Sequence, residues 1–368
     1  MVETNMKIFE NKKKIIFTII MIVVICFIIN HFFGGEGRFV RTGDMVIPRF
    51  GHSAVLLNDG RVLITGGYWN EKGHNNTTAP KSAEIYNPKT GKFTRTGDMH
   101  FGRAYHSTIL LNDGKVLVVG GGPQQAELYN PETSKFSVTG SLPVKFFNAI
   151  GEQASVIKLK NGEIFIIEGV SKDGTTWIIK YSPKNEKFNL VKKTKLYHGA
   201  QNAILLQDGN ILIVGGYKPQ KAEIYNPDTK QLTFTNNEND IIGSIISVLL
   251  DKNIILLIEN FKNNNMKLFD INHNTFNNIN HPEYWDCKGI CTATLLNNGK
   301  VLIIGIDKNK QKLYDPDKDR FINTKRVKLS HLGQAATLLQ NGNVLITGGK
   351  KPKIVMTSSN TALLYKIK

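Results

Sequence analysis

Residues 54–67 read AVLLNDGRVLITGG, two apolar runs that are joined by Asp59-Gly60 and followed by a glycine pair. Asp and Gly tolerate the positive φ angles that a two-residue hairpin turn requires, so the stretch predicts a β-hairpin with its turn at Asp59-Gly60. The glycines at 66 and 67 allow a sharp bend or the close approach of another backbone. The stretch therefore predicts the first two strands of an antiparallel sheet.

The hairpin recurs along the rest of the chain at spacings of 43 to 54 residues. In each unit a third run ends in an aromatic residue such as Tyr86, and most units continue into a proline turn such as Asn87-Pro88. Seven residues after the aromatic, an apolar residue such as Phe93 begins a fourth run. Each unit therefore predicts a four-stranded antiparallel sheet. The seven hairpin turns are Asp59-Gly60, Asp113-Gly114, Asn161-Gly162, Asp208-Gly209, Asp251-Lys252, Asn298-Gly299 and Asn341-Gly342.

A single sheet of this kind cannot bury both of its faces, so the seven are expected to stack radially as the blades of a propeller. The seventh unit ends soon after its aromatic residue, Tyr365, and before a fourth strand. Residues 38–45, RFVRTGDM, closely match KFTRTGDM at 92–99, the fourth strand of the first unit. We therefore expect the N-terminal strand, residues 39–45, to close the ring and remove the sheet edges that invite aggregation.

The glycine pair, the aromatic spacing and the repeat length of ~47 residues resemble kelch repeats of the galactose-oxidase central-domain type. The resemblance covers residues 39–368 and implies an all-β, seven-bladed kelch β-propeller. Two features depart from it: Phe93 and its equivalents stand where many such repeats carry tryptophan, and the third, fifth and sixth units lack the glycine pair. The resemblance also implies that the loops leading into the innermost strands gather around the central axis.

The N-terminal residues predict a membrane anchor. A basic head, residues 1–14, precedes an apolar run, residues 15–33, which only Thr18, Asn30 and His31 interrupt. As a helix the run extends about 28 Å, close to the ~30 Å hydrocarbon thickness of a bilayer. The lysines before it place the N-terminus in the cytoplasm, so the fold class is a propeller with an N-terminal transmembrane helix, joined by a short linker, residues 34–38, and displayed outside the membrane. A cleaved signal peptide is the alternative, although it needs a shorter apolar run.

The 368-residue chain carries 47 Lys and Arg against 30 Asp and Glu, a formal net charge of +17, which favours anionic partners. Its three cysteines exclude a disulfide-dense scaffold. Cys287 and Cys291 lie four residues apart and, outside the cell, predict a small disulfide loop, with free thiols as the alternative. We expect no metal, no cofactor and no nucleic-acid partner.

Candidate site residues come from aligning the leading loops, the segments before each innermost strand such as residues 42–52, on the turn glycine. If two sets of positions face one mouth of the ring, they offer donors for a carboxylate, sulfate or phosphate. Alternatively, they are solvated loop residues or hydrogen-bond partners within turns. Eleven residues before the turn glycine, five of seven positions are cationic or can become so: Arg49, Arg103, His198, Lys288 and His331. Eight residues before it, the mostly polar set includes His52, His106, Gln201 and Gln334.

These features favour a binding protein over an enzyme. The predicted function is a recognition module for an anionic carbohydrate, such as a cell-wall polymer, or for a protein. The alternative is a carbohydrate-active enzyme that resembles the kelch neuraminate epimerases, with Arg49 or Arg103 gripping a carboxylate and His52, His106 or His198 transferring a proton. An oxidase-like activity is the other enzymatic resemblance; it implies two His and two Tyr at the axis around copper, but no such quartet can be assigned from the sequence.

Overall fold

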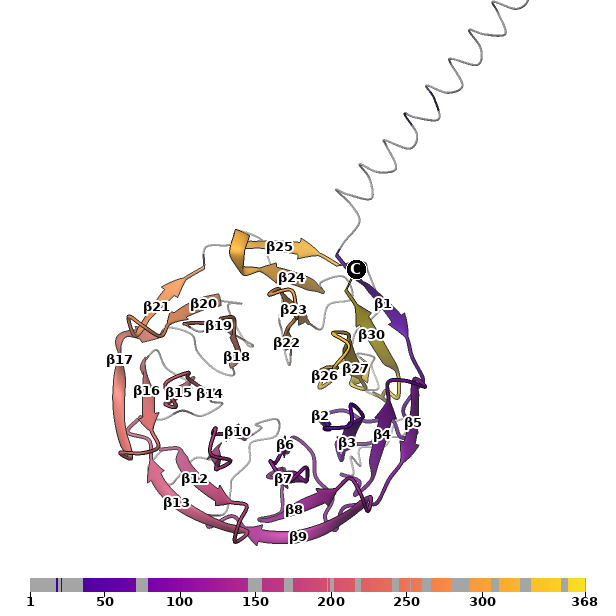
Figure 1. Ribbon diagram of the computed structural model, residues 1–368, viewed down its shortest axis with the longest axis horizontal. Coiled ribbons are helices and arrows are strands. Elements are labelled where there is room, and N and C mark those ends of the chain that lie inside the picture. The colour runs from indigo at the N-terminus through magenta and orange to yellow at the C-terminus, as the bar shows by residue number, and fades with distance from the viewer. Residues whose placement is uncertain are drawn as a thin grey trace, which may run out of the picture.

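The computed structural model describes residues 18, 21, 36–70, 79–144, 154–168, 175–196, 198, 202–215, 220–239, 245–251, 253–259, 266–279, 291–305, 311–324, 332–351 and 357–367. Over these residues the chain forms seven four-stranded antiparallel sheets around a central axis and one short two-stranded sheet (Figure 1). The all-β, seven-bladed propeller that the repeats predict is therefore confirmed. In each of blades 1 to 6 the four strands pair in chain order, with the first strand nearest the axis and the fourth at the rim.

The strands of the first six blades follow the predicted repeat units. Blade 1 consists of β2 (Ser53–Leu56), β3 (Val62–Thr65), β4 (Ala83–Asn87) and β5 (Lys92–Arg95), and blade 2 of β6 (Ser107–Leu110), β7 (Val116–Val119), β8 (Gln125–Asn130) and β9 (Lys135–Ser141). Blade 3 consists of β10 (Ser155–Lys158), β11 (Ile164–Glu168), β12 (Trp177–Ser182) and β13 (Lys187–Lys193), and blade 4 of β14 (Asn202–Leu205), β15 (Ile211–Val214), β16 (Gln220–Asn226) and β17 (Gln231–Asn239). Blade 5 consists of β18 (Ile245–Leu249), β19 (Ile254–Glu259), β20 (Met266–Asp270) and β21 (Thr275–Asn278). Blade 6 consists of β22 (Thr292–Leu295), β23 (Val301–Ile304), β24 (Lys312–Asp315) and β25 (Arg320–Asn323), with a 3-10 turn, η1 (Pro316–Lys318), before β25.

Blade 7 draws its strands from both ends of the described chain. Its inner strands are β26 (Ala335–Leu338), β27 (Val344–Thr347) and β30 (Ala362–Lys366), and its outermost strand is β1 (Arg38–Arg41). In this pair Phe39 lies opposite Tyr365 and Val40 opposite Leu364. The N-terminal strand thus completes the seventh sheet, and the ring is continuous (Figure 1). The two-stranded sheet, β28 (Lys350–Lys351) with β29 (Thr357–Ser358), lies between β27 and β30 in the chain.

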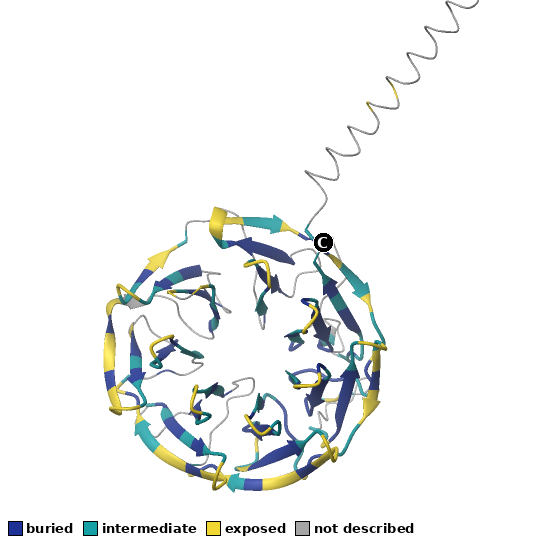
Figure 2. Ribbon diagram, viewed as in Figure 1, coloured by how far each residue is buried: buried dark blue, intermediate teal, exposed yellow. Residues whose placement is uncertain are grey.

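The hydrophobic core lies between neighbouring blades. Every residue of β3 and β7 is buried, because these apolar second strands have a blade on either side. Leu63 of blade 1, for example, packs in one cluster with Val116 and Val118 of blade 2. The rim strands such as β5 bury one residue in four, and Figure 2 shows exposed residues concentrated at the rim and at the turns. Burial between blades therefore fixes the positions of the leading loops.

The predicted anchor, residues 15–33, lies outside the described residues except for Thr18 and Met21. Within the part of the chain that the structure describes, no helix has both the length and the apolar character that crossing a bilayer requires. Membrane anchoring and topology remain predictions.

Candidate functional site

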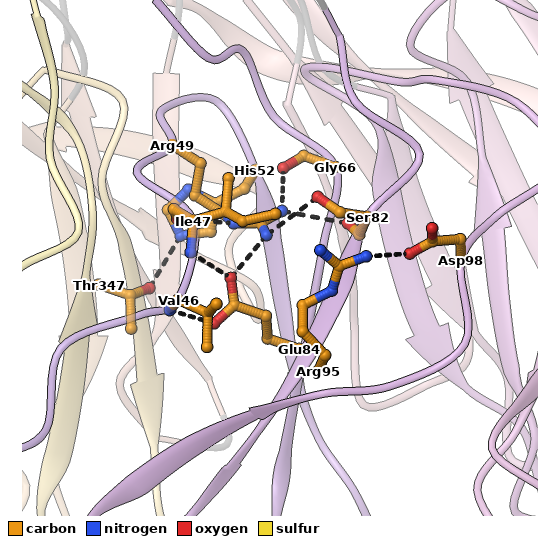
Figure 3. Close-up of polar contacts among 10 residues, drawn as sticks. All are labelled: Val46, Ile47, Arg49, His52, Gly66, Ser82, Glu84, Arg95, Asp98 and Thr347. Carbon is orange, nitrogen blue, oxygen red and sulfur yellow. Dashed lines mark hydrogen bonds and ion pairs between the residues drawn. The ribbon is translucent and has the colours of Figure 1, made fainter. Parts of the chain in front are cut away.

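Arg49 lies in the leading loop of blade 1 and is completely buried. Its guanidinium group donates to the carboxylate of Glu84 on β4 at 2.7 Å and to the carbonyl oxygen of Gly66 at 2.5 Å (Figure 3). Glu84 also accepts the backbone N–H groups of Val46 and Ile47, at 2.7 and 2.9 Å. The pair therefore fastens the leading loop to the third strand of its own blade. It leaves no exposed guanidinium surface for a ligand.

Blades 2 and 4 repeat this arrangement. Arg103 is completely buried, and its Nε donates to Glu127 at 3.2 Å, while Glu127 also accepts the backbone N–H of His100. His198 is buried as well, with its Nε2 2.8 Å from Glu223. Because a buried charge is costly unless it is paired, each carboxylate and its cationic or imidazole partner form a unit that holds one loop. The structure thus places Arg49, Arg103 and His198 inside their blades, not around one open mouth.

The polar set eight residues before the turn glycine joins neighbouring blades. His52 Nε2 lies 2.8 Å from the hydroxyl of Thr347, the last residue of β27 in blade 7 (Figure 3). His106 Nε2 lies 2.7 Å from the hydroxyl of Thr65, the last residue of β3 in blade 1. Gln334 donates to the carbonyl at the end of β23 in blade 6, at 3.4 Å. These three side chains therefore belong to the contacts between consecutive blades.

The two histidines at these contacts are poor bases. Burial, followed by the positive charges of Arg103 and Arg49, lowers the pKa of His106 to about 3. Burial, followed by Arg49 and His106, holds the pKa of His52 well below its ordinary value. A general base works best when its pKa lies near the operating pH. The pKa values of these imidazoles are therefore unsuited to proton transfer near neutral pH.

The glycine pairs are also contacts between blades. Gly66 has a φ of +55°, and a Cβ on it would overlap the carbonyl oxygen of Arg103 in blade 2. The next residue, Gly67, donates its N–H to that same carbonyl at 2.8 Å, and Gly349 donates in the same way to Arg49. The pair therefore meets both expectations for glycine, a left-handed φ and a close approach of another backbone.

The sequence reasoning missed the carboxylates that hold the cationic positions. A glutamate stands two residues before the third-strand aromatic in only three units, and these are the units in which Arg49, Arg103 or His198 stands eleven residues before the turn glycine. The threonine contacts leave a similar signal, since Thr precedes the glycine pair only in the units before His52 and His106. Comparing the repeats with one another could therefore have found both sets of contacts. The three glutamates are Glu84, Glu127 and Glu223.

The structure describes only some of the remaining predicted residues. Gln201, Lys288, His331 and Cys287 lie outside the described residues, so their roles remain predictions. Cys291 is buried and disulfide-bonded, and its partner also lies outside the described residues. Among the residues that the structure describes, no three His, Cys, Asp or Glu side chains gather as a metal-binding set.

Comparisons with known proteins agree with this architecture. A family model for the Kelch motif matches residues 48–100, which include blade 1. Beta-scruin of Limulus polyphemus is 34% identical over 85 residues, which make up 22% of this chain, and the chain spans only 8% of that relative's length. The chain is a seven-bladed β-propeller that matches the Kelch motif over blade 1.

Two solved structures share the ring. A fungal alcohol oxidase of the AA5 family, in complex with copper, matches with a TM-score of 0.70 and 17% identity, over 90% of this chain and 76% of that chain. A streptogramin B lyase matches with a TM-score of 0.63 and 11% identity, over 90% of this chain and 98% of that one. At such identities the likeness concerns the fold, which hosts unrelated activities.

The copper in the first of these structures raises the question of whether the present residues fit such a centre. His52 and His106 are buried, and the Nε2 atom of each is already bonded to a threonine hydroxyl of the preceding blade. Cys291, the one cysteine among the described residues, is disulfide-bonded and so not available for a link to tyrosine. The described residues do not fit a copper radical site.

Proposed function

We propose that the protein is a recognition module that binds an anionic carbohydrate, and that an N-terminal anchor, residues 15–33, displays it outside the membrane. One observation carries the proposal: in the sequence, a third-strand glutamate accompanies only three of the five cationic positions of the leading loops. Glutamates satisfy the three in blades 1, 2 and 4. In blades 6 and 7 the position of the glutamate holds Lys312 and Leu363 instead. The sequence therefore has no glutamate at this third-strand position in the blades of Lys288 and His331.

A cationic position without this glutamate is suited to an external anion. The two positions belong to consecutive blades, and the chain as a whole carries a formal net charge of +17. Support for recognition over an enzymatic role comes from the imidazoles of His52, His106 and His198. Each already bonds to Thr347, Thr65 or Glu223, and the pKa of His106 is about 3.

The test is salt-dependent retention of the full-length chain on immobilised polygalacturonate, with immobilised polyglutamate as an acidic polypeptide for comparison. We expect the double variant Lys288→Ala/His331→Ala to elute from polygalacturonate at clearly lower salt than the wild type, because exposed charge interactions are screened. The control Lys89→Ala/Lys135→Ala removes two exposed lysines, one shortly before the rim strand β5 and one on the rim strand β9, and is expected to elute like the wild type. Equal elution of all three chains, or retention on polyglutamate alone, contradicts the proposal; the latter points to a protein partner.

Arg49 and Arg103 are unsuitable for such a test. Replacing either with alanine leaves a buried glutamate without its partner, a change that costs about 3–5 kcal/mol in comparable pairs. Weaker binding by these variants would report on folding.

The anchor is tested separately. In cells that express the full chain, we expect it to stay with the membrane after alkaline extraction, and protease added to intact cells to reach the propeller. Release by alkali, or full protection from the protease, overturns the proposed topology.

A further inference from the structure

A row of aromatic rings crosses the boundary between blades 1 and 2 on the side of the leading loops. Phe50, in the leading loop of blade 1, forms a β-bridge with Tyr68, which follows β3, and the centroids of the two rings lie 5.5 Å apart. Tyr105, in the leading loop of blade 2, meets the ring of Tyr68 edge-on at 5.8 Å. Phe50 is buried, whereas Tyr68 and Tyr105 are half-buried.

Tyr105 occupies a backbone position that suits glycine. Its φ is +53°, and the equivalent residues of blades 1 and 7 are Gly51 and Gly333, with φ values of +61° and +69°. The three are linked around the axis, since Gly51 donates its N–H to Gly333 at 2.8 Å and Tyr105 donates to Gly51 at 2.7 Å. A left-handed φ is costly for a residue with a Cβ, and such strain often marks a functional position. The strain is therefore expected to be offset by a role of the Tyr105 side chain that a glycine could not fill.

A cation lies beside the same row. Lys350, at the start of β28 in blade 7, places its Nζ 5.0 Å from the centroid of the Phe50 ring. The β-bridge between Lys350 and Leu332 ties this segment to the leading loop of blade 7. Within the described chain, the hydroxyl groups of Tyr68 and Tyr105 form no hydrogen bond to another residue. Half-exposed aromatic rings, free hydroxyls and an ammonium group thus meet where blades 7, 1 and 2 converge.

We propose that Tyr68, Tyr105 and Lys350 form a ledge that binds an acidic sugar residue of a glycan. The apolar C–H face of a pyranose packs on an aromatic ring as other apolar groups do, the phenol hydroxyls bond to sugar hydroxyls, and the ammonium of Lys350 pairs with the carboxylate. This second proposal depends on the proposed function and specifies the chemical class of sugar that is bound. The ledge is separate from Lys288 and His331, so each can be tested alone.

The experiment measures binding of a galacturonic acid hexamer, and of a neutral galactose hexamer as its uncharged match, to the full-length chain by titration calorimetry in a detergent without sugar groups. We expect Tyr68→Ala, Tyr105→Gly and Lys350→Ala each to raise the Kd for the acidic hexamer about tenfold or more, equivalent to about 1.4 kcal/mol. Phe234→Ala is the matched control, because Phe234 is 38% exposed but lies on β17 at the rim. It is expected to bind like the wild type.

Tyr105→Gly separates binding from stability. Glycine accepts the left-handed φ, so we expect this variant to keep or exceed the wild-type midpoint of urea unfolding while it loses affinity. A lower midpoint with wild-type affinity means that Tyr105 serves only to pack the loops, and it overturns the ledge. Wild-type affinity in all three ledge variants also overturns the ledge but leaves the proposed function in place. Failure of the wild-type chain to bind the acidic hexamer overturns both.

Discussion

Hydroxyl pairs link the third strand of one blade to the rim strand of the blade before it. The hydroxyl of Tyr129 in blade 2 lies 2.7 Å from that of Thr96 in blade 1. Tyr225 of blade 4 is buried, and its hydroxyl has no partner among the described residues. Val191 packs in the same cluster and, like Thr96, stands three residues after the rim-strand aromatic. A methyl group of Val191 thus stands where a hydroxyl partner for Tyr225 is expected.

Replacing Val191 with threonine is expected to stabilise the protein. The new hydroxyl has nearly the shape of the methyl it replaces and can pair with the orphaned hydroxyl of Tyr225, whose pKa burial raises to about 12. A typical buried hydrogen bond adds about 1 kcal/mol to the free energy of unfolding. Urea unfolding of Val191→Thr against the wild type measures the change.

The reverse substitution is the control. Thr96→Val leaves the hydroxyl of Tyr129 without its partner, so it is expected to cost about 1–3 kcal/mol. If Val191→Thr is no more stable than the wild type while Thr96→Val is destabilised, the hydroxyl of Tyr225 does not need a partner.

At the scale of strands, β1 closes the ring through its pairing with β30, and this pairing is called the seam. Phe39 is half-buried, with its ring centroid 4.9 Å from that of Tyr365 on β30. Because the ring is only partly removed from solvent, Phe39→Ala is expected to cost about 2 kcal/mol, below the 3–5 kcal/mol of a core phenylalanine. The free energy of unfolding measures this. Arg41→Ala, on the same strand but largely exposed, is expected to change it by less than about 0.5 kcal/mol, and equal effects would contradict the seam.

Strands and loops differ in how well they can be predicted from this sequence. The turn at Asp59-Gly60 and the match between residues 38–45 and 92–99 define the strand order, because pairing in a meander follows chain order. In the leading loops, counting from the turn glycine aligns positions along the chain but not the directions of side chains. The alignment therefore predicts that Arg49 faces the mouth of the ring, although its side chain lies inside the blade and pairs with Glu84, 35 residues later. The bridge between Phe50 and Tyr68 recurs between the equivalent residues Leu332 and Lys350, but the contact of the two aromatic rings depends on side-chain directions that the repeat does not give.

At the scale of the whole molecule, buried histidines at the contacts among blades 7, 1 and 2 couple folding to pH. The folded-state pKa of His106 is about 3, whereas in the unfolded chain it is about 6.5. Above pH 6.5 neither state binds the proton. Below it only the unfolded state does, so stability falls by about 1.4 kcal/mol per pH unit for this residue until the pH nears 3.

We therefore expect the free energy of unfolding to fall between pH 6.5 and pH 5, by about 2 kcal/mol for His106 alone. His106→Gln, which introduces the residue that blade 7 uses as Gln334, is expected to remove that share of the slope. Urea unfolding at pH 7, 6 and 5 tests this. Identical slopes in wild type and His106→Gln would contradict the link.

The pairing of Arg38 with Lys366 also means that the two ends of the described ring are neighbours. A short peptide joining them would make the backbone circular without disturbing any sheet. New termini could then be opened at a rim turn of another blade, such as Asn130-Pro131, so that a different blade becomes the composite one. What the amino-acid sequence encodes is thus a cyclic order of blades, in which the choice of first residue is incidental to the architecture.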